Sequence, residues 1–177
     1  ENYPINAEVT SVIPETDELC ANQDKWEVDN GPASANLMST NDPVRNHNLC
    51  NPVTPDHFDD EDWLKLSVRS GHTYEISTTP PSSSPASLTI DLYANDGITK
   101  LASASAEHLG EQTTLIWTAD RNGQVYIRIK HIDENIIGED VVYSISIQEF
   151  VFYMPLIFNN SSNFNTFEHF FPGVNHE

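Results

Sequence analysis

The chain has 177 residues, and its 27 Asp and Glu residues outnumber its 8 Lys and Arg residues, so its formal net charge is −19. This charge argues against nucleic acid and anionic membranes as partners, because both bind basic surfaces. No apolar run approaches the roughly 18 residues of a membrane-spanning helix, so we expect no membrane insertion.

Residues 1–23 do not carry the pattern of a domain core. Val9, Val12 and Ile13 form a short apolar stretch between Pro4 and Pro14, which is compatible with one strand. We interpret this segment as an N-terminal arm or linker. Since the chain opens on Glu1 and shows no signal peptide, we expect the mature, processed form of a secreted protein.

The two cysteines, Cys20 and Cys50, fit one disulfide, because no CxxC or Cys/His zinc spacing accompanies them. A bond between them would close a loop of about 30 residues and contribute roughly 3–4 kcal/mol of stability. Disulfides persist in oxidising compartments, so this bond predicts an extracellular or cell-surface location. The alternative is two unrelated buried thiols.

Residues 26–50 are rich in Asn, Pro, Asp and Ser, and we expect an irregular segment with one short strand. Residues 59–78 then begin with four consecutive acids and continue with apolar and polar residues in alternation. This period of two is typical of a half-buried strand. Gly71 marks a turn before the alternation restarts at Tyr74, so we predict a hairpin with an acidic loop at its mouth.

Alternation and turn signals continue to residue 148 with a spacing of about ten residues, which is typical of antiparallel sandwiches. We therefore predict an all-β, jelly-roll-like antiparallel β-sandwich of about seven to nine strands over residues 24–148, with extended N- and C-terminal segments. The predicted strands cover residues 63–69, 73–79, 87–94, 99–104, 113–118, 124–131 and 141–148. The predicted core comprises Leu88, Ile90, Leu92, Val125, Ile127, Ile129, Tyr143, Ile145 and Ile147.

The C-terminal tail, residues 149–177, begins with a run that is apolar on both faces, residues 150–158. Such a run invites association when it is exposed to water. Either it packs along its own domain or it docks on a neighbouring copy. The residues expected to mediate self-association are Phe150, Phe152, Met154, Leu156 and Phe158.

Five pieces of this sequence, in the same order, resemble the bacterial pre-peptidase C-terminal domain. They include an acid-x-Asp-Trp motif ending at Trp63, a Gly-x-Thr-Tyr motif ending at Tyr74, and a Trp-Thr-Ala motif beginning at Trp117. The resemblance covers roughly residues 24–148. It implies a small secreted β-sandwich related to the collagen-binding domains of clostridial collagenases.

The resemblance also implies a Ca²⁺ site. In the collagen-binding relatives, an acidic N-terminal linker and the acidic loop before the first long strand provide the ligands together. By position, these ligands are Glu27, Asp29, Asn30, Asp59 and Asp62, with Asp60 as a neighbouring alternative. Lys25 stands where a further acid is often found, which argues against a second ion. The alternative is that residues 59–62 cap a loop in solvent.

We expect the chain not to be an enzyme. It has no G-x-S-x-G, H-E-x-x-H, P-loop or G-x-G-x-x-G motif. No pair of carboxylates is singled out for glycosidase chemistry. The histidines are scattered through predicted loops and ends, so we expect surface positions for His47, His57, His72, His108, His131, His169 and His176.

Two functions are compatible with these features. The favoured one is an extracellular structural subunit of a filament, sheath or surface layer, which binds other copies of itself through terminal strand exchange. Either residues 5–13 or residues 150–158 would supply the exchanged strand. The alternative is an accessory module of a secreted peptidase that binds collagen or polysaccharide through Trp26, Tyr93 and Tyr126. Trp63 and Trp117 are expected to pack in the core or at an edge.

Overall fold

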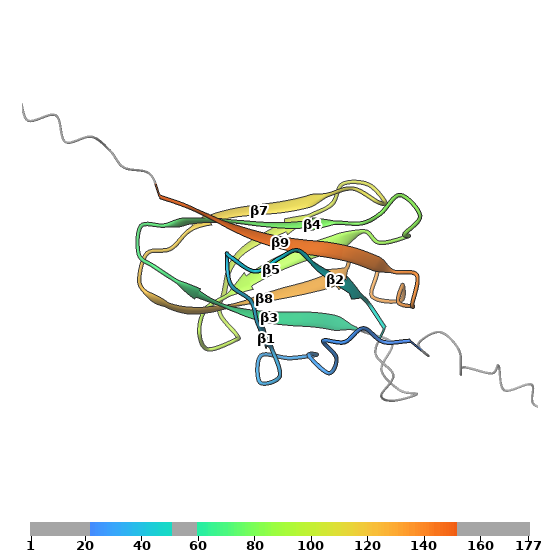
Figure 1. Ribbon diagram of the computed structural model, residues 1–177, viewed down its shortest axis with the longest axis horizontal. Helices are drawn as coiled ribbons and strands as arrows, with labels where there is room; N and C mark the ends of the chain where they lie inside the picture. Colours follow the sequence, from blue (N-terminus) through green and yellow to red (C-terminus); the bar gives the residue numbers. More distant parts are fainter. Residues whose placement is uncertain (1–21, 51–59, 152–177) are drawn as a thin grey trace, which may run out of the picture.

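Two facing β-sheets make up the part of the chain that the computed structural model describes, residues 22–50 and 60–151 (Figure 1). One sheet has the strand order β1-β3-β8-β5-β6, and the other has the order β2-β9-β4-β7. These described residues contain no helix, and the predicted all-β sandwich is confirmed. The strands are β1 (Asn36–Leu37), β2 (Arg45–Asn48), β3 (Glu61–Val68), β4 (Thr73–Thr79), β5 (Leu88–Tyr93), β6 (Lys100–Ser105), β7 (Thr113–Thr118), β8 (Gly123–His131) and β9 (Val142–Phe150).

The core lies between the sheets and follows the alternation of the sequence. From Val125 on, every second residue of β8 is buried, as is every second residue over most of β9, while the intervening residues are partly exposed. All nine residues predicted for the core are buried, with exposed fractions of 0–4%. Period-two patterning thus identified the inner faces of β5, β8 and β9.

The predicted hairpin of residues 63–79 is wrong. Strand β3 pairs with β8 in one sheet, whereas β4 pairs with β7 and β9 in the other. The turn between them therefore crosses from sheet to sheet, and Gly71 adopts a φ of 79° there. Alternation shows which residues face the core, but it is the same for a hairpin and for a crossing between sheets.

The N-terminal part of the described chain contributes two short edge strands instead of the one expected. Strand β1 pairs in parallel with residues Leu64 and Lys65 of β3, and β2 pairs with residues 142–145 of β9. These pairings hold residues 22–48 against the start of β3. The described chain begins at that end of the sandwich and leaves β9 at the other end (Figure 1).

Candidate metal centre

The second residue of strand β3 is an acid that points inward. Asp62 lies on the same face of β3 as Leu64, Leu66 and Val68, and it has no exposed surface. Asp60, directly before β3, is 3% exposed. Asp60 and Asp62 are therefore buried at the end of the core, which does not fit the alternative of acids that cap a loop in solvent.

A second acidic segment reaches the same place from the N-terminal side. The backbone carbonyl of Asp29 accepts a hydrogen bond from the backbone N–H of Trp63 at 3.0 Å, which fixes this segment beside β3. Glu27, Asp29 and Asp62 each offer a carboxylate oxygen, and these oxygens lie within 4.8 Å of one another. Three carboxyl groups thus converge at the junction of residues 27–29 with β3.

The two most buried of these carboxylates have hydrogen-bonding capacity left over. Oδ2 of Asp29 accepts a hydrogen bond from the side-chain amide of Asn36 at 2.9 Å. Oδ1 of Asp29 and Oδ1 of Asp62 are buried and accept no hydrogen bond from any described residue. A buried carboxylate oxygen without a hydrogen bond is costly, so Oδ1 of Asp29 points to a ligand, whereas Oδ1 of Asp62 also faces Nδ1 of His47 at 3.6 Å.

The pKa values of these carboxyl groups reflect their burial and their mutual repulsion. Burial, followed by the charge of Asp62, raises the pKa of Glu27 to about 7, that of Asp29 to about 8 and that of Asp60 to about 9. Burial also raises the pKa of Asp62, although His47 and Tyr143 oppose the shift. Near neutral pH, these four groups therefore favour either a proton or a cation among them.

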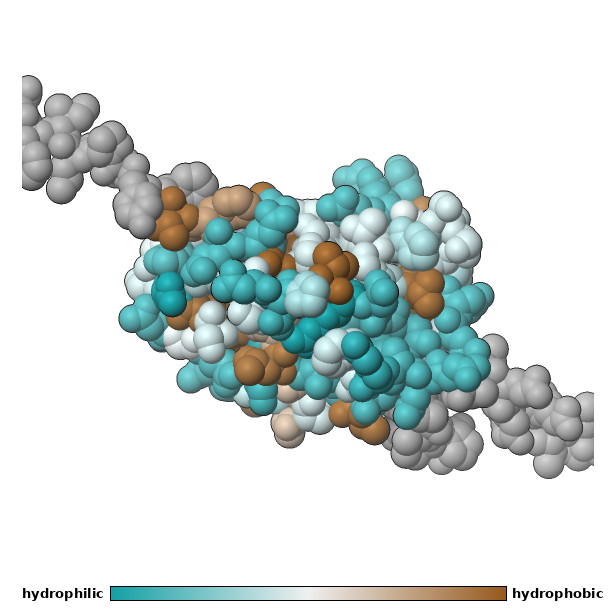
Figure 2. Space-filling view, viewed as in Figure 1, coloured by the Kyte–Doolittle hydropathy of each residue, from teal (hydrophilic) through white to brown (hydrophobic). Residues whose placement is uncertain are grey.

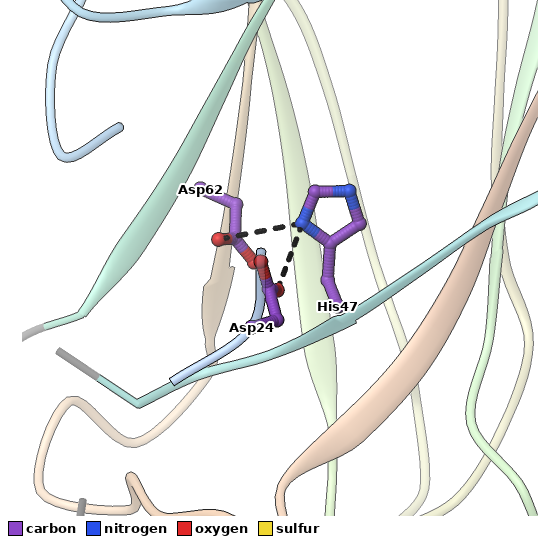
Figure 3. Close-up of side chains that lie close together, drawn as sticks. All are labelled: Asp24, His47 and Asp62. Carbon is purple, nitrogen blue, oxygen red and sulfur yellow. Dashed lines mark ion pairs between the residues drawn. The ribbon is translucent and has the colours of Figure 1, made fainter. Parts of the chain in front are cut away.

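Asp62 also belongs to a second cluster, with Asp24 and His47 (Figure 3). Nδ1 of His47 lies 3.3 Å from Oδ2 of Asp24 and 3.6 Å from Oδ1 of Asp62. Burial lowers the pKa of His47, but the two carboxylates outweigh it and raise the value to about 9. His47 is therefore an imidazolium at neutral pH and serves as an internal counter-charge.

Aromatic rings fix the position of this histidine. The His47 ring is stacked between Trp26 and Tyr143, with centroid distances of 5.9 and 5.5 Å. The Tyr143 hydroxyl donates a hydrogen bond to Oδ2 of Asp62. Both nitrogens of the imidazole are buried and form no hydrogen bond with the described residues, so His47 acts on Asp62 through its charge.

The structure brings together most of the predicted ligands. Glu27, Asp29 and Asp62 converge, and Asp60 interacts electrostatically with all three. Asn30 is half-buried beside Asp29, and Asp59 lies outside the described residues. Sequence reasoning missed Asp24 and His47, because residues 24–48 have no periodicity that would show their shared contact with β3.

Two of the predicted surface histidines are buried, so that expectation is wrong for them. His47 is 2% exposed, and His131, at the end of β8, is 4% exposed. Nδ1 of His131 accepts a hydrogen bond from the backbone N–H of Asp133 at 3.0 Å. His72 and His108 retain exposed surface, and the other three histidines lie outside the described residues.

The aromatic residues predicted to grip a polymer are also less exposed than expected. Tyr93 is 8% exposed and packs against Trp63 with ring centroids 5.2 Å apart. Trp26 is half-buried under His47, and Tyr126 is half-buried beside the pair of Trp63 and Tyr93. The packing role expected of Trp63 is confirmed.

A scan against known protein families found no match, and a search of curated proteins found none either. Among solved structures, the chain is similar to the pre-peptidase C-terminal domain of a Bacillus anthracis collagenase. The identity is 19%, the match covers 64% of this chain and 94% of that domain, and the TM-score is 0.46.

Two further solved structures are similar over comparable lengths. One is PliG from Aeromonas hydrophila, a periplasmic inhibitor of g-type lysozyme, with 10% identity, coverage of 66% of this chain and 99% of PliG, and a TM-score of 0.40. The other is the C-terminal domain of EclA, a sugar-binding protein, with 16% identity, coverage of 70% and 90%, and a TM-score of 0.37.

Proposed function

We propose that the protein is a non-catalytic, extracellular β-sandwich module that binds Ca²⁺ at Glu27, Asp29, Asp60 and Asp62. The observation that carries the proposal is the convergence of buried carboxylates in which Oδ1 of Asp29 and Oδ1 of Asp62 accept no hydrogen bond from the described residues. Asn30 and Asp59, the other expected ligands, are neighbours of this group in the sequence.

The chemistry of the donors favours Ca²⁺ over other common metal ions. Ca²⁺ takes six to eight oxygens in flexible geometry, whereas Zn²⁺ prefers nitrogen and sulfur and Mg²⁺ demands near-ideal octahedra. Among the described residues, the one histidine in these clusters is His47, and its Nδ1 faces the carboxylates of Asp24 and Asp62. A bound Ca²⁺ would replace protons among the carboxylates and tie residues 27–29 to the start of β3.

Thermal melting with and without the ion tests the proposal. With about 1 mM Ca²⁺, a range in which extracellular modules bind it, the melting temperature is expected to rise by several degrees above that of EDTA-treated protein. The same concentration of Mg²⁺ should give a much smaller rise. Equal melting temperatures in Ca²⁺ and EDTA would remove the metal site.

The accessory role proposed for this module is to bind an extracellular polymer, either collagen or a polysaccharide. The motifs shared with pre-peptidase C-terminal domains support this role. Pull-down of the full chain on insoluble collagen, chitin and cellulose tests it. Recovery of the protein on none of these polymers would count against the accessory role.

A second candidate function is the self-associating subunit of a filament, sheath or surface layer. It is favoured by one feature, since β2 covers only residues 142–145 of β9 and no described strand pairs with residues 146–150 on that side. Phe150 and Val151 are 38% and 41% exposed there, and hydrophobic residues gather beside this end of β9 (Figure 2). An extended segment from another copy would extend the sheet at this edge. Phe152, Met154, Leu156 and Phe158 lie outside the described residues.

A further inference from the structure

A pocket of about 340 Å³ opens at the end of the sandwich opposite the carboxylate cluster. Strand β3 runs from Asp62 in the cluster to Val68 in the pocket, and its six-residue span corresponds to about 20 Å. The turn between β5 and β6, the end of β7 and the start of β8 complete the walls. The pocket and the candidate metal centre are therefore separate sites.

The floor of the pocket is apolar and contains a tryptophan. Val68, Leu101, Trp117 and Val125 contribute to it. Trp117 continues the inward-facing series of Thr113 and Leu115, but it is only half-buried because the sandwich ends there. Its ring packs against Tyr74 with centroids 6.4 Å apart. The partly exposed aromatic ring of Trp117 is thus available to a ligand.

The rim of the pocket is polar, and part of it is fixed in position. Oδ1 of Asp96 accepts hydrogen bonds from the backbone N–H groups of Ile98 and Thr99, at 2.9 and 2.8 Å. Oδ1 of Asn122 accepts one from the backbone N–H of Ser70 at 2.8 Å, so the N–H groups of its amide remain as donors. Arg121 pairs with Asp120 through two bonds of 3.1 Å.

We propose that this pocket binds one pyranose unit of a neutral polysaccharide. The apolar face of a sugar ring suits an aromatic floor, while its hydroxyls pair with planar carboxylate, amide and guanidinium groups. The volume lies at the lower end of the roughly 300–1,000 Å³ of ligand pockets, which fits one ring of a chain that continues into solvent. The net charge of −19 disfavours acidic polysaccharides.

A peptide side chain is the competing occupant, and the rim argues against it. An apolar side chain would cover the floor but would leave the amide N–H groups of Asn122 without partners. The hydroxyl oxygens of a sugar can accept hydrogen bonds from these N–H groups. This inference specifies the polymer of the accessory role proposed above and rests on that role.

Tryptophan fluorescence of the full chain, titrated with short cello-, chito-, malto- and manno-oligosaccharides, tests the inference. One of these oligosaccharide series should change the tryptophan fluorescence until the signal saturates. Trp117→Phe, which keeps a ring against Tyr74, should weaken binding roughly threefold to tenfold. Arg121→Ala removes a guanidinium group from the pocket lining and should weaken binding as well. Arg121 is 82% exposed, so its removal leaves the fold intact. Arg69→Ala is the matched control, an exposed arginine outside the pocket lining.

Because the Trp117→Phe variant itself changes the fluorescence, its affinity is measured by calorimetry, and melting curves confirm that each variant is folded. Binding that both pocket variants leave unchanged would overturn the pocket, as would competition by tyrosine- or leucine-containing peptides but by no sugar. If the full chain is recovered on collagen while no oligosaccharide binds, the accessory role is supported and the proposed sugar site is refuted. If neither polymer nor sugar binds, both proposals are refuted.

Discussion

Oδ1 of Asp62 lies 3.6 Å from Nδ1 of His47, and neither side chain has any exposed surface. The same Asp62 also lies within the carboxylate group of Glu27 and Asp29. One buried aspartate therefore joins an internal cation to a group of acids that repel one another. It is the residue whose removal separates the two clusters.

We expect Asp62→Asn to abolish most of the stabilisation by Ca²⁺. The substitution removes a central carboxylate of the proposed site but keeps an oxygen that can accept the hydrogen bond of Tyr143. Loss of one charged ligand should weaken Ca²⁺ binding by tenfold or more, as measured by calorimetry and by the rise in melting temperature. Asp120→Asn, an exposed acid at the other end of the sandwich, is the control. An Asp62→Asn protein that responds to Ca²⁺ like the wild type would place the ion elsewhere.

The dependence of stability on pH should be opposite in sign to that of ordinary salt-bridged acids. The folded pKa values of Glu27, Asp29 and Asp60, about 7, 8 and 9, lie above those of an unfolded chain, so the folded state holds their protons more tightly. Their contribution is fully present below the unfolded values near pH 4 and is lost as the pH rises through the folded values.

His47 acts in the same direction, because its contribution is complete below its unfolded pKa of about 6.5 and is lost through a folded value of about 9. In EDTA, the melting temperature should therefore fall between about pH 6 and pH 9. Ca²⁺ competes with protons for the carboxylates, so the rise that it produces should be larger at about pH 8 than at about pH 5.5. A rise that shrinks with pH would contradict this account.

Asp91, a buried acid outside the carboxylate cluster, should give the opposite dependence of stability on pH. It accepts hydrogen bonds from Ser103 at 2.6 Å and from Arg128 at 2.6 Å, and Lys100 lies 2.8 Å away. Burial raises its pKa, but Lys100, Ser103 and Arg128 outweigh burial and lower the value to about 2. Its contribution is present above the unfolded pKa near 3.8 and is lost as the pH falls towards 2.

Asp91→Asn should cost about 1.5–3 kcal/mol at neutral pH, as for hydrogen bonds to charged groups. In a chain of this length, that cost corresponds to a fall in melting temperature of roughly 3–12 °C. The difference from the wild type should shrink as the pH falls towards 2. Asp120→Asn, which breaks an ion pair whose side chains are 71% and 82% exposed, should change the stability little. Equal losses in the two variants would show that burial of Asp91 is unimportant.

The sequence predicted the inner faces of β5, β8 and β9, because alternation reports burial directly. It did not predict which strands pair, since β3 and β4 carry the pattern of a hairpin but belong to different sheets. Glu27, Asp29 and Asp62 were found through motif resemblance. His47 was not found, because its burial depends on β2 joining the edge of β9, and four residues without apolar alternation give no sign of that pairing.

The disulfide between Cys20 and Cys50 remains a prediction. Cys50 follows Leu49, the first residue after β2, and it has no exposed surface. Cys20 lies outside the described residues. We expect iodoacetamide to label the denatured protein only after reduction, as measured by intact mass. Reduction should lower the free energy of unfolding by roughly 3–4 kcal/mol. Labelling of both thiols without reductant would rule out the bond.

Self-association should depend on the residues that follow β9. A chain that ends at Val151 keeps all of β9, including the pairing of Phe150 with Thr73, and should fold as the full chain does. We expect the full chain to show an apparent mass that rises with concentration in light scattering, and the shortened chain to remain monomeric.

Within the full chain, Phe152→Asp with Leu156→Asp should act like the truncation, because two charges on the apolar run oppose its burial. Asn159→Asp with Asn163→Asp adds the same charge to the polar part of the tail and should leave association intact. A full chain that stays monomeric at every concentration, or a tail control that dissociates as readily as the Phe152 and Leu156 variant, would leave the accessory module as the remaining function.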